Sequence, residues 1–381
     1  MKYSILKWAL LSGLFLSFIQ FSFAETHANK RNIKGFDVIC CDVSKIKDTI
    51  DLKLSDFMDQ CEMVKLETTA HSVLGRIHYV SVSDNYIAVF TYDRPHIPVK
   101  LFHRDGKFVC DVGLIGKGPG EYTSLYGIQI DEPANRIYLT PFANAQQILV
   151  YDLKGNPMPE IRLVYKQTKC RVFIEDGIVT VLSMPFNDQI PVAYQQTTSG
   201  KLIKELPRMK HLIQRPDFSH EISSDHNTNA YDLFILPWGA DQPDTLYHYN
   251  IKKNILEPKF VISDGDAKVG SWYREYKKFY FSYLWGEKYN GKKILVDKES
   301  LKADYFNLVN DFYGGIGLNE FFMSQHGMFT ASMSADELMN KLDKVLQSKN
   351  LSSDQKVKIT AARKTLDIND NPILFIGEMK D

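Results

Sequence analysis

Lys100-Leu-Phe-His-Arg-Asp-Gly106 and Leu149-Val-Tyr-Asp-Leu-Lys-Gly155 share one pattern, a short run of β-forming residues that ends in a turn. Three later stretches repeat it, at 193–200, 246–254 and 293–300. The turn positions 106, 155, 200, 254 and 300 lie 49, 45, 54 and 46 residues apart. Gly and Asn recur at these positions, and they accept the positive φ of tight hairpins. A β-unit that recurs every ~40–50 residues is typical of the four-stranded blades of a β-propeller.

Strands can be placed inside each unit from the β-forming runs and from the Asp, Asn and Pro residues that favour turns. Blade one is predicted over 76–112, with strands at 76–80, 86–92, 99–103 and 108–112. Blade two is predicted over 125–164, with strands at 125–131, 136–141, 147–152 and 160–164. The turns after their first strands are predicted at 83–85 and 131–135. The next three blades are predicted over 168–205, 229–262 and 278–311.

The last unit differs from the others because it contains helical patterns. Strands are predicted at 319–325 and 328–333, and Ser334 followed by Glu337 predicts a helix N-terminus with a capping box. After this N-terminus, one apolar stripe at helical spacing is formed by Leu338, Leu342, Val345 and Leu346. A second helical stretch is predicted over 354–366. We expect these helices to serve packing rather than function. A propeller must also close its ring, so the strand at 373–376 is expected to pair with the N-terminal stretch Glu62–Glu67.

The N-terminus has the three parts of a secretory signal peptide. A lysine-containing start is followed by an apolar run, Trp8–Ile19, and then by Ser22-Phe23-Ala24. We expect cleavage after Ala24 and a periplasmic or extracellular protein without a lipid anchor, because no cysteine stands at the cleavage site. The predicted organisation is therefore a signal peptide (1–24), an N-terminal segment (25–60) and a six-bladed, all-β propeller (61–381) with a helical insertion at about 334–366.

Charge and cysteine content exclude some classes of protein. The chain has 46 basic and 46 acidic residues, which argues against a nucleic-acid binder because phosphate contacts need a basic surface. Its five cysteines include no Cys-x-x-Cys pair. A disulfide from Cys40 or Cys41 to Cys61 and a set of buried free thiols both remain open.

Ile115-Gly-Lys-Gly-Pro-Gly-Glu-Tyr122, after the last strand of blade one, resembles a loop of the six-bladed β-propeller proteins abundant in Bacteroidetes. Weaker resemblances to that family lie at 64–68, 244–247 and 371–374. The resemblance implies a secreted or lipid-anchored protein of the TolB-like propeller superfamily, a largely uncharacterised group. It implies the fold and the compartment much more than any chemistry.

Candidate binding residues come from this loop and from the tryptophans. The glycine loop lacks the third glycine and the following helix of a dinucleotide site, so it is predicted to be a crossover between blades. Glu121 and Tyr122 could still line the mouth of the central channel. Trp238, Trp272 and Trp285 could stack on sugar rings or could fill the space between blades, and we favour packing.

Two classes of function follow. The first is a non-catalytic module that binds a protein or glycan partner, because no catalytic constellation stands out. The alternative is a lactonase-type or hydrolase-type enzyme with a calcium ion in the channel. Asp367-Ile-Asn-Asp-Asn371 with Glu378 matches the outer positions of a calcium loop, but Pro372 replaces the glycine of the sharp turn. A structural Asn-Pro turn is therefore favoured there.

Overall fold

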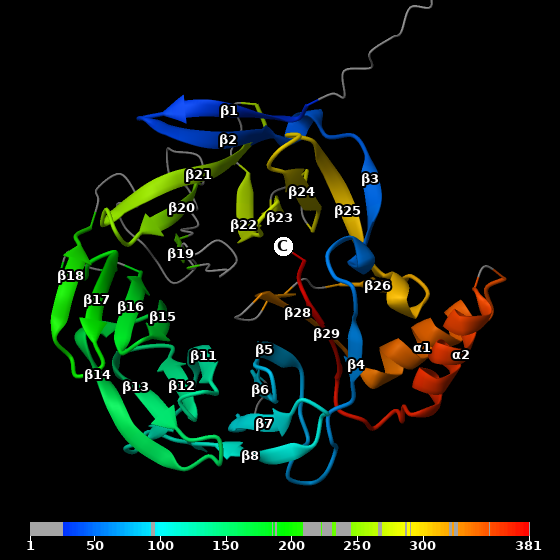
Figure 1. Ribbon diagram of the computed structural model, residues 1–381, viewed down its shortest axis with the longest axis horizontal. Coiled ribbons are helices and arrows are strands. Elements are labelled where there is room, and N and C mark those ends of the chain that lie inside the picture. The colour runs from blue at the N-terminus through cyan, green and yellow to red at the C-terminus, as the bar shows by residue number, and fades with distance from the viewer. Residues whose placement is uncertain are drawn as a thin grey trace, which may run out of the picture.

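Six blades form a closed ring in the computed structural model of the chain, which confirms the predicted all-β propeller (Figure 1). The structure describes residues 26–92, 96–184, 186, 189–208, 222, 231–233, 245–265, 269–285, 288–289, 291–319, 322–323, 327–349 and 351–380. The predicted signal peptide lies outside the described residues.

Each blade is an antiparallel sheet whose first strand lies nearest the middle of the ring (Figure 1). Blade one contains β5 (Ile77–Val82), β6 (Tyr86–Thr91), β7 (Val99–His103) and β8 (Phe108–Val112). Blade two contains β11 (Leu125–Asp131), β12 (Arg136–Pro141), β13 (Ala145–Tyr151) and β14 (Pro157–Gln167). Blade three contains β15 (Cys170–Glu175), β16 (Ile178–Ser183), β17 (Ala193–Thr197) and β18 (Leu202–Leu206).

The remaining blades share strands with the N-terminal segment. Blade four contains β19 (Tyr231–Leu233), β20 (Thr245–Asn250) and β21 (Ile255–Ser263), with β2 (Phe36–Asp42) and β1 (Ala28–Ile33) at its outer side. Blade five contains β22 (Gly270–Glu275), β23 (Phe279–Trp285), β24 (Lys293–Asp297), β25 (Ala303–Asn310), β26 (Ile316–Leu318) and β3 (Thr49–Lys53). The closing blade contains β27 (Phe322–Met323), β28 (Met328–Met333), β29 (Ile373–Glu378) and β4 (Glu62–Val64).

The predicted start of blade five at residue 278 is wrong. The strand nearest the channel is β22, eight residues earlier, which pairs with β23 from Gly270↔Trp285 to Glu275↔Tyr280. Trp272 and Arg274 are at least partly exposed, whereas Tyr273 and Glu275 are buried, so charged and aromatic residues occupy both faces and no apolar face marks the strand in the sequence.

The hydrophobic core of the described residues lies between the blades. It divides into six clusters, and each cluster combines side chains of two neighbouring blades. Between blades one and two, for example, Phe90 and Leu101 share a cluster with Ile128 and Leu139. Because every blade buries both of its faces in this way, the stability of one blade depends on its neighbours.

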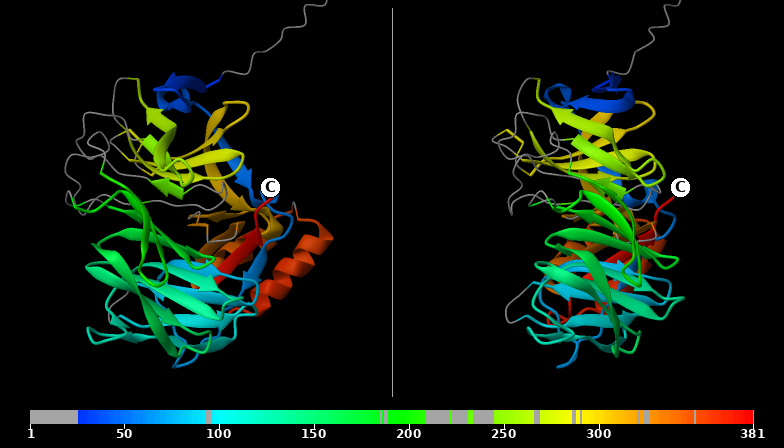
Figure 2. Two further views of the ribbon diagram at one scale, coloured as in Figure 1. Left: turned by 60° about the vertical axis from the view of Figure 1, so that its left-hand side comes forward. Right: turned by 90° about the vertical axis from the view of Figure 1, so that its left-hand side faces the viewer.

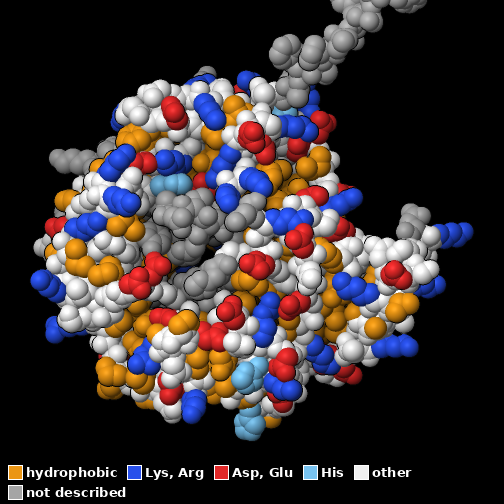
Figure 3. Space-filling model, viewed as in Figure 1, with side chains coloured by type: hydrophobic (Ala, Val, Ile, Leu, Met, Phe, Trp, Pro, Cys, Tyr) orange, Lys and Arg blue, Asp and Glu red, His pale blue; other side chains and the backbone are white. Residues whose placement is uncertain are grey.

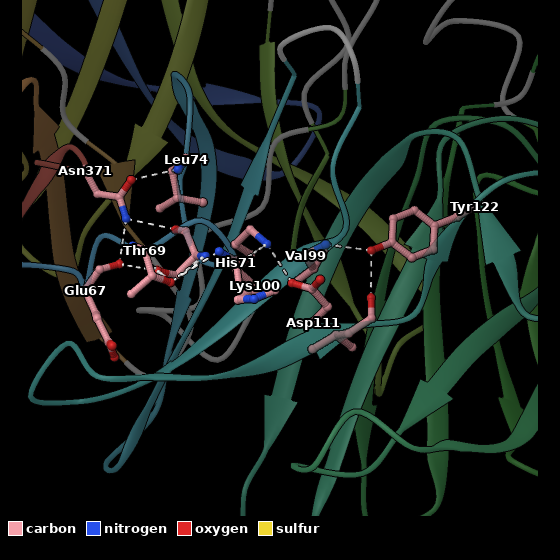
Figure 4. A network of polar contacts seen from close by, with 11 residues as sticks. Glu67, Thr69, His71, Leu74, Val99, Lys100, Asp111, Tyr122 and Asn371 are labelled. Atoms are coloured by element: carbon pink, nitrogen blue, oxygen red, sulfur yellow. Dashed lines mark hydrogen bonds and ion pairs between the residues drawn. The ribbon is translucent and has the colours of Figure 1, made fainter. Parts of the chain in front are cut away.

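The ring closes where the two ends of the propeller meet, as predicted. β4 pairs antiparallel with β29 in the register Val64↔Leu374, Met63↔Phe375 and Glu62↔Ile376. Asn371, just before β29 and only 2% exposed, reinforces this closure (Figure 4). Its amide accepts a hydrogen bond from the Leu74 N–H (2.7 Å) and donates to the carbonyls of Glu67 (2.8 Å) and Ser72 (2.9 Å). It therefore fastens the closing blade to the loop that leads into blade one.

The segment before β4 runs along the outside of the ring (Figures 1 and 2). β2 pairs in parallel with β21 of blade four, and β3 pairs in parallel with β25 of blade five. Residues 28–64 thus contact the outer side of three successive blades. We call this segment the N-terminal strap.

Two helices lie between β28 and β29, α1 (Ala335–Leu346) and α2 (Ser353–Lys364). Leu338, Leu342 and Ile359 are fully buried against blade five and the closing blade, so the prediction that the helices serve packing is confirmed. Ser334 is the N-cap residue of α1, but the predicted capping box does not form. Glu337 instead forms an ion pair with Lys341 (2.8 Å), one turn further along the helix. A complete capping box is found at the start of α2.

All five cysteines are free thiols, which settles the alternatives left open by the sequence. Cys41, Cys61 and Cys170 are buried, and burial raises their pKa to about 12. Among the described residues, no helix is long and apolar enough to cross a membrane.

Replacing Asn371 by alanine tests the closure. The Asn371→Ala variant leaves the buried Leu74 N–H and Ser72 carbonyl without their side-chain partner, while the Glu67 carbonyl keeps the Ser72 hydroxyl, and each orphaned group costs ~1–3 kcal/mol. We therefore expect the free energy of unfolding, measured in urea, to fall by roughly 2–4 kcal/mol. Asn369→Ala in the same turn, where the side chain is exposed, is the control and should change it by less than about 0.5 kcal/mol. Equal effects of the two substitutions would contradict the role given to Asn371.

Candidate functional site

The turns that follow the innermost strands surround a hollow at one end of the central channel. This hollow, the channel mouth, has a volume of about 1190 Å³ and is lined by all six blades and by the N-terminal strap. The C-terminal strand ends beside it, and Figure 3 shows charged side chains of both signs around the hollowed middle of this face. Its charged lining residues are Asp56, Asp84, Arg104, Asp131, Glu132, Glu175, Asp176, Lys277, Lys278, Glu378 and Lys380.

Four carboxylates of the channel mouth are exposed and make no side-chain hydrogen bond or ion pair within the described part of the chain. Asp84 follows the innermost strand of blade one, Glu175 and Asp176 follow that of blade three, and Glu378 ends β29. Their negative charges therefore face solvent in the mouth.

Two of the cations at the mouth are already paired. The Arg104 guanidinium lies 3.3 Å from the Glu62 carboxylate. The Lys380 ammonium lies 3.0 Å from Asp59 and donates to the Ser55 carbonyl at 2.9 Å. Glu62 and Asp59 do not line the mouth. Arg104 and Lys380 are thus partly neutralised by acids outside the mouth. The unpaired carboxylates of blades one and three therefore make that side of the mouth acidic.

Hydrogen bonds between blades hold the turns of the mouth in place. Glu132 accepts the backbone N–H (3.1 Å) and the side-chain amide (2.5 Å) of Asn85, which joins blade two to blade one. Burial opposes ionisation of Glu132, but bonds from Asn85 and Ser83 outweigh it and lower the pKa of the carboxyl. Gln129 bonds the Ile174 carbonyl (2.8 Å) and N–H (3.1 Å), which joins blade two to blade three. The rim is thus preorganised.

The aromatic side chains near the mouth are mostly buried. Phe57, Phe173 and Tyr276 are 3%, 6% and 2% exposed. These rings pack beneath the surface of the mouth and therefore offer little exposed area on which a sugar ring could stack. The exposed chemistry of the mouth is therefore that of carboxylates and ammonium groups.

The structure places Glu121 and Tyr122 away from the described lining of this mouth. Tyr122 is 3% exposed, accepts a hydrogen bond from the Val99 N–H (2.7 Å) and donates to the Val112 carbonyl (2.8 Å), as Figure 4 shows. Glu121 accepts the Gly118 N–H at 2.8 Å and folds back over the glycine loop. Both residues hold the crossover between blades one and two, and Tyr122 joins the open ends of β7 and β8.

Two of the three candidate tryptophans lie in one hairpin. Trp272 in β22 is 36% exposed and lies under the Arg274 guanidinium, 4.8 Å from its ring centre. Trp285 ends β23 and contacts Tyr283, with ring centres 5.1 Å apart. Neither tryptophan is among the residues that line the mouth, and Trp238 lies outside the described residues.

The Asp367–Asn371 stretch forms a turn closed by its own groups. Asp367 accepts the Asn369 N–H at 2.9 Å, and Asp370 forms an ion pair with Lys65 at 2.8 Å. Asn371 is committed to the ring closure, and Glu378 lies at the far end of β29. Within the described ranges, no three His, Cys, Asp or Glu residues are grouped so that they could hold a metal ion.

Sequence reasoning missed the mouth carboxylates, although a signal was present. Ser83-Asp84-Asn85 and Asp131–Asn135 were identified as turns after innermost strands. In a propeller all turns of that kind lie on one face, so their acidic residues had to gather there. The position of these turns after the first strands therefore predicts an acidic site at one end of the channel.

Comparison with known proteins adds a family and a structural likeness. A family model described as "Domain of unknown function (DUF4934)" matches residues 36–378. A Bacteroides fragilis structure named "putative exported protein" is similar at a TM-score of 0.57 and 17% identity, covering 88% of this chain and 99% of that one. A protein of unknown function from Bacteroides caccae is similar at a TM-score of 0.38 and 13% identity, covering 62% and 83%. No curated protein matches the sequence.

Removing the Tyr122 hydroxyl tests its structural role. In Tyr122→Phe the Val99 N–H and the Val112 carbonyl lose their buried partner, so unfolding in urea should require ~1–3 kcal/mol less free energy. Tyr138→Phe is the control, because the Tyr138 hydroxyl has no hydrogen-bond partner in the described structure, and it should change by less than about 0.5 kcal/mol. A Tyr122→Phe protein as stable as the control would contradict this role.

Proposed function

We propose that this chain, which belongs to the DUF4934 family, is an exported, non-catalytic module that binds a protein partner at the channel mouth. The partner is one that presents a basic segment to blades one and three. The observation that carries the proposal is the set of unpaired, exposed carboxylates on a preorganised rim, Asp84, Glu175, Asp176 and Glu378.

Physical chemistry supports a protein partner at this site. Carboxylates held on turns that are already fixed lose little conformational entropy when they bind. Complementary charge speeds association and selects the orientation of the partner. Buried aromatic rings at the mouth favour a polypeptide over a glycan, because glycan binding commonly uses exposed rings.

Export from the cytoplasm is part of the same proposal. The signal-like pattern of residues 1–24 and the name of the Bacteroides fragilis structure both support it. The loop at 115–122 supports a place among the TolB-like propellers of Bacteroidetes. Cleavage after Ala24 without lipid attachment would release the propeller into the periplasm or the medium.

A partner search with charge variants tests the mouth. The first variant combines Asp84→Asn, Glu175→Gln and Asp176→Asn. The matched control combines Asp48→Asn, Glu160→Gln and Asp354→Asn, three exposed carboxylates with no side-chain partner in the described structure. Both variants remove three negative charges, so they separate a local effect from net charge.

Immobilised mature protein should retain a partner from an extract of the exporting bacterium, identified by quantitative mass spectrometry. Wild type and control should retain it equally, and the mouth variant should retain at least roughly tenfold less, as should wild type at high salt, which screens exposed charges. Equal retention by all three proteins would overturn the proposal. So would glycan-array binding that the mouth variant leaves intact, in the absence of a retained protein.

The calcium-dependent enzyme is the second candidate, and the electrostatics of the channel disfavour it. Arg171 in β15 and Arg274 in β22 stand on innermost strands. Guanidinium groups are always charged and raise the cost of placing a divalent cation nearby. The channel wall is therefore better suited to anions.

Metal removal separates the two candidates. A resident calcium ion would stabilise the folded state by mass action, so chelation would lower the melting temperature. We expect EDTA, or added calcium chloride after EDTA, to shift the Tm measured by calorimetry by less than about 1 °C. A fall of several degrees that calcium reverses would favour the enzyme.

A further inference from the structure

Arg171 is the second residue of β15, and no carboxylate among the described residues pairs with it. Its guanidinium stacks on the Tyr126 ring of blade two, 4.4 Å from the ring centre. It donates to the carbonyls of Tyr126 (2.5 Å) and Ile222 (3.1 Å). The two carbonyls take only part of the guanidinium N–H donors, and neither they nor the aromatic ring neutralises the full charge. Within the described chain Arg171 makes no ion pair.

His78 lies on β5, the innermost strand of blade one, and is exposed. Its ring contacts Tyr92, with ring centres 3.9 Å apart. The protein around the ring shields part of it from water, and this desolvation is the main cause that lowers the pKa of His78 to about 4. The positive charges of Arg171 and Arg76 lower the pKa further. Near neutral pH the imidazole is therefore uncharged, held so in part by the arginines around it.

These side chains form one continuous group across three blades. The Tyr92 hydroxyl donates to the carbonyl of Leu125, the residue before Tyr126, at 3.4 Å. The Tyr126 ring in turn lies against the Arg171 guanidinium. The Tyr126 hydroxyl accepts the Ile222 N–H at 3.1 Å, which fixes the ring under the guanidinium. We call His78, Tyr92, Tyr126 and Arg171 the inner-wall cluster.

We propose that the inner-wall cluster binds an oxyanion group, a sulfate, a phosphate or the carboxylate of a small ligand. The Arg171 guanidinium supplies the charge, and planar N–H donors match the oxygens of such groups. His78 supplies a ring N–H, and Tyr92, which is 38% exposed, supplies an edge on which a ligand ring can rest.

This site is separate from the channel mouth. Arg171 begins the strand that ends at Glu175, and four residues of extended chain span ~13 Å. That distance exceeds the screening length of about 8 Å at physiological salt. The two proposals can therefore fail independently. The mouth variant described above should bind an oxyanion as wild type does.

Protonation of His78 and binding of an anion must reinforce each other. An anion beside the imidazole stabilises its charged form and raises its pKa. By linkage, the anion then binds more tightly as the pH falls through the pKa of His78. The charged and titratable groups around His78 are Arg76, Arg171, Tyr92 and Tyr126.

Histidine NMR on the full mature chain is the test. The His78 resonance is identified by its loss in His78→Gln and is followed from about pH 3 to about pH 8 in chloride buffer, with and without sulfate. Sulfate keeps its charge over this range. We expect saturating sulfate to raise the pKa of His78 and to bind about tenfold more tightly when His78 is protonated. An unchanged pKa would overturn the proposal.

Arginine variants show whether the effect is local. Arg171→Gln should raise the pKa of His78 without sulfate and abolish the response to sulfate. Arg136→Gln is the matched control, because Arg136 also donates only to carbonyls, those of Ala134 and Asn135, and it should respond as wild type does. If Arg171→Gln still responds to sulfate, the anion binds elsewhere and the proposal is wrong.

The source of the oxyanion is resolved by comparing three small ligands. Glucuronate carries a carboxylate on a sugar ring, sulfate is an oxyanion alone, and glucose is the ring alone. Tighter binding of glucuronate than of sulfate would identify an acidic sugar as the ligand, and equal binding would identify a free oxyanion. Binding of glucose, or of none of the three, would overturn the site.

Discussion

The pairing of β4 with β29 is the constraint on which the rest of the structure depends. Only three residue pairs join the two strands, and no disulfide supports them. The ring is therefore held closed by short-range packing and hydrogen bonds rather than by covalent links. Val64, Leu374 and Ile376 bury this seam in a cluster shared with blade one, and Asn371 ties the same seam to the loop before that blade. Opening it would expose two faces of the core at once.

Closure also explains the N-terminal strap. The chain must travel from the outer side of blade four to the closing blade before the propeller can begin at blade one. It does so by adding β2 and β3 in parallel to strands that would otherwise be exposed edges, which are prone to aggregation. The strap thus covers blades four and five while it delivers β4 to the seam. α1 and α2 extend the same packing on the closing blade, where Gly314 leaves room for Val345 and Ile359.

The repeat of turns predicted five blades because a hairpin turn is a local feature, and the need to close the ring supplied the sixth. Strands such as β7, β8, β11 and β12 were predicted to the residue, since their ends are marked by Gly, Asp, Asn or Pro. The parallel pairings of β2 and β3 were not predictable in this way, because their partners lie more than 200 residues away. The side of a strand that a residue occupies was equally out of reach, because a slip of one residue exchanges the two faces. For this reason the sequence did not identify Arg171 and His78 as residues of the channel wall. For the same reason Tyr122 was predicted as a candidate lining residue of the channel, although it belongs to the core.

The direction of the innermost strands gives the channel its polarity. Because these strands run the same way in every blade, residues near their starts gather towards one end of the channel, and the turns after them gather at the other. β15 carries Arg171 near its start and Glu175 at its end, and β5 carries His78 near its start and leads to Asp84. Arg171 on the wall and the unpaired carboxylates at the mouth are therefore kept apart, because they stand at opposite ends of strands that run one way. A ligand with an acidic part and a basic part would meet complementary charge at both ends in one orientation only. Selection of orientation by charge acts on association rates and specificity more than on affinity, and this is the selection that the proposed binding at the mouth requires.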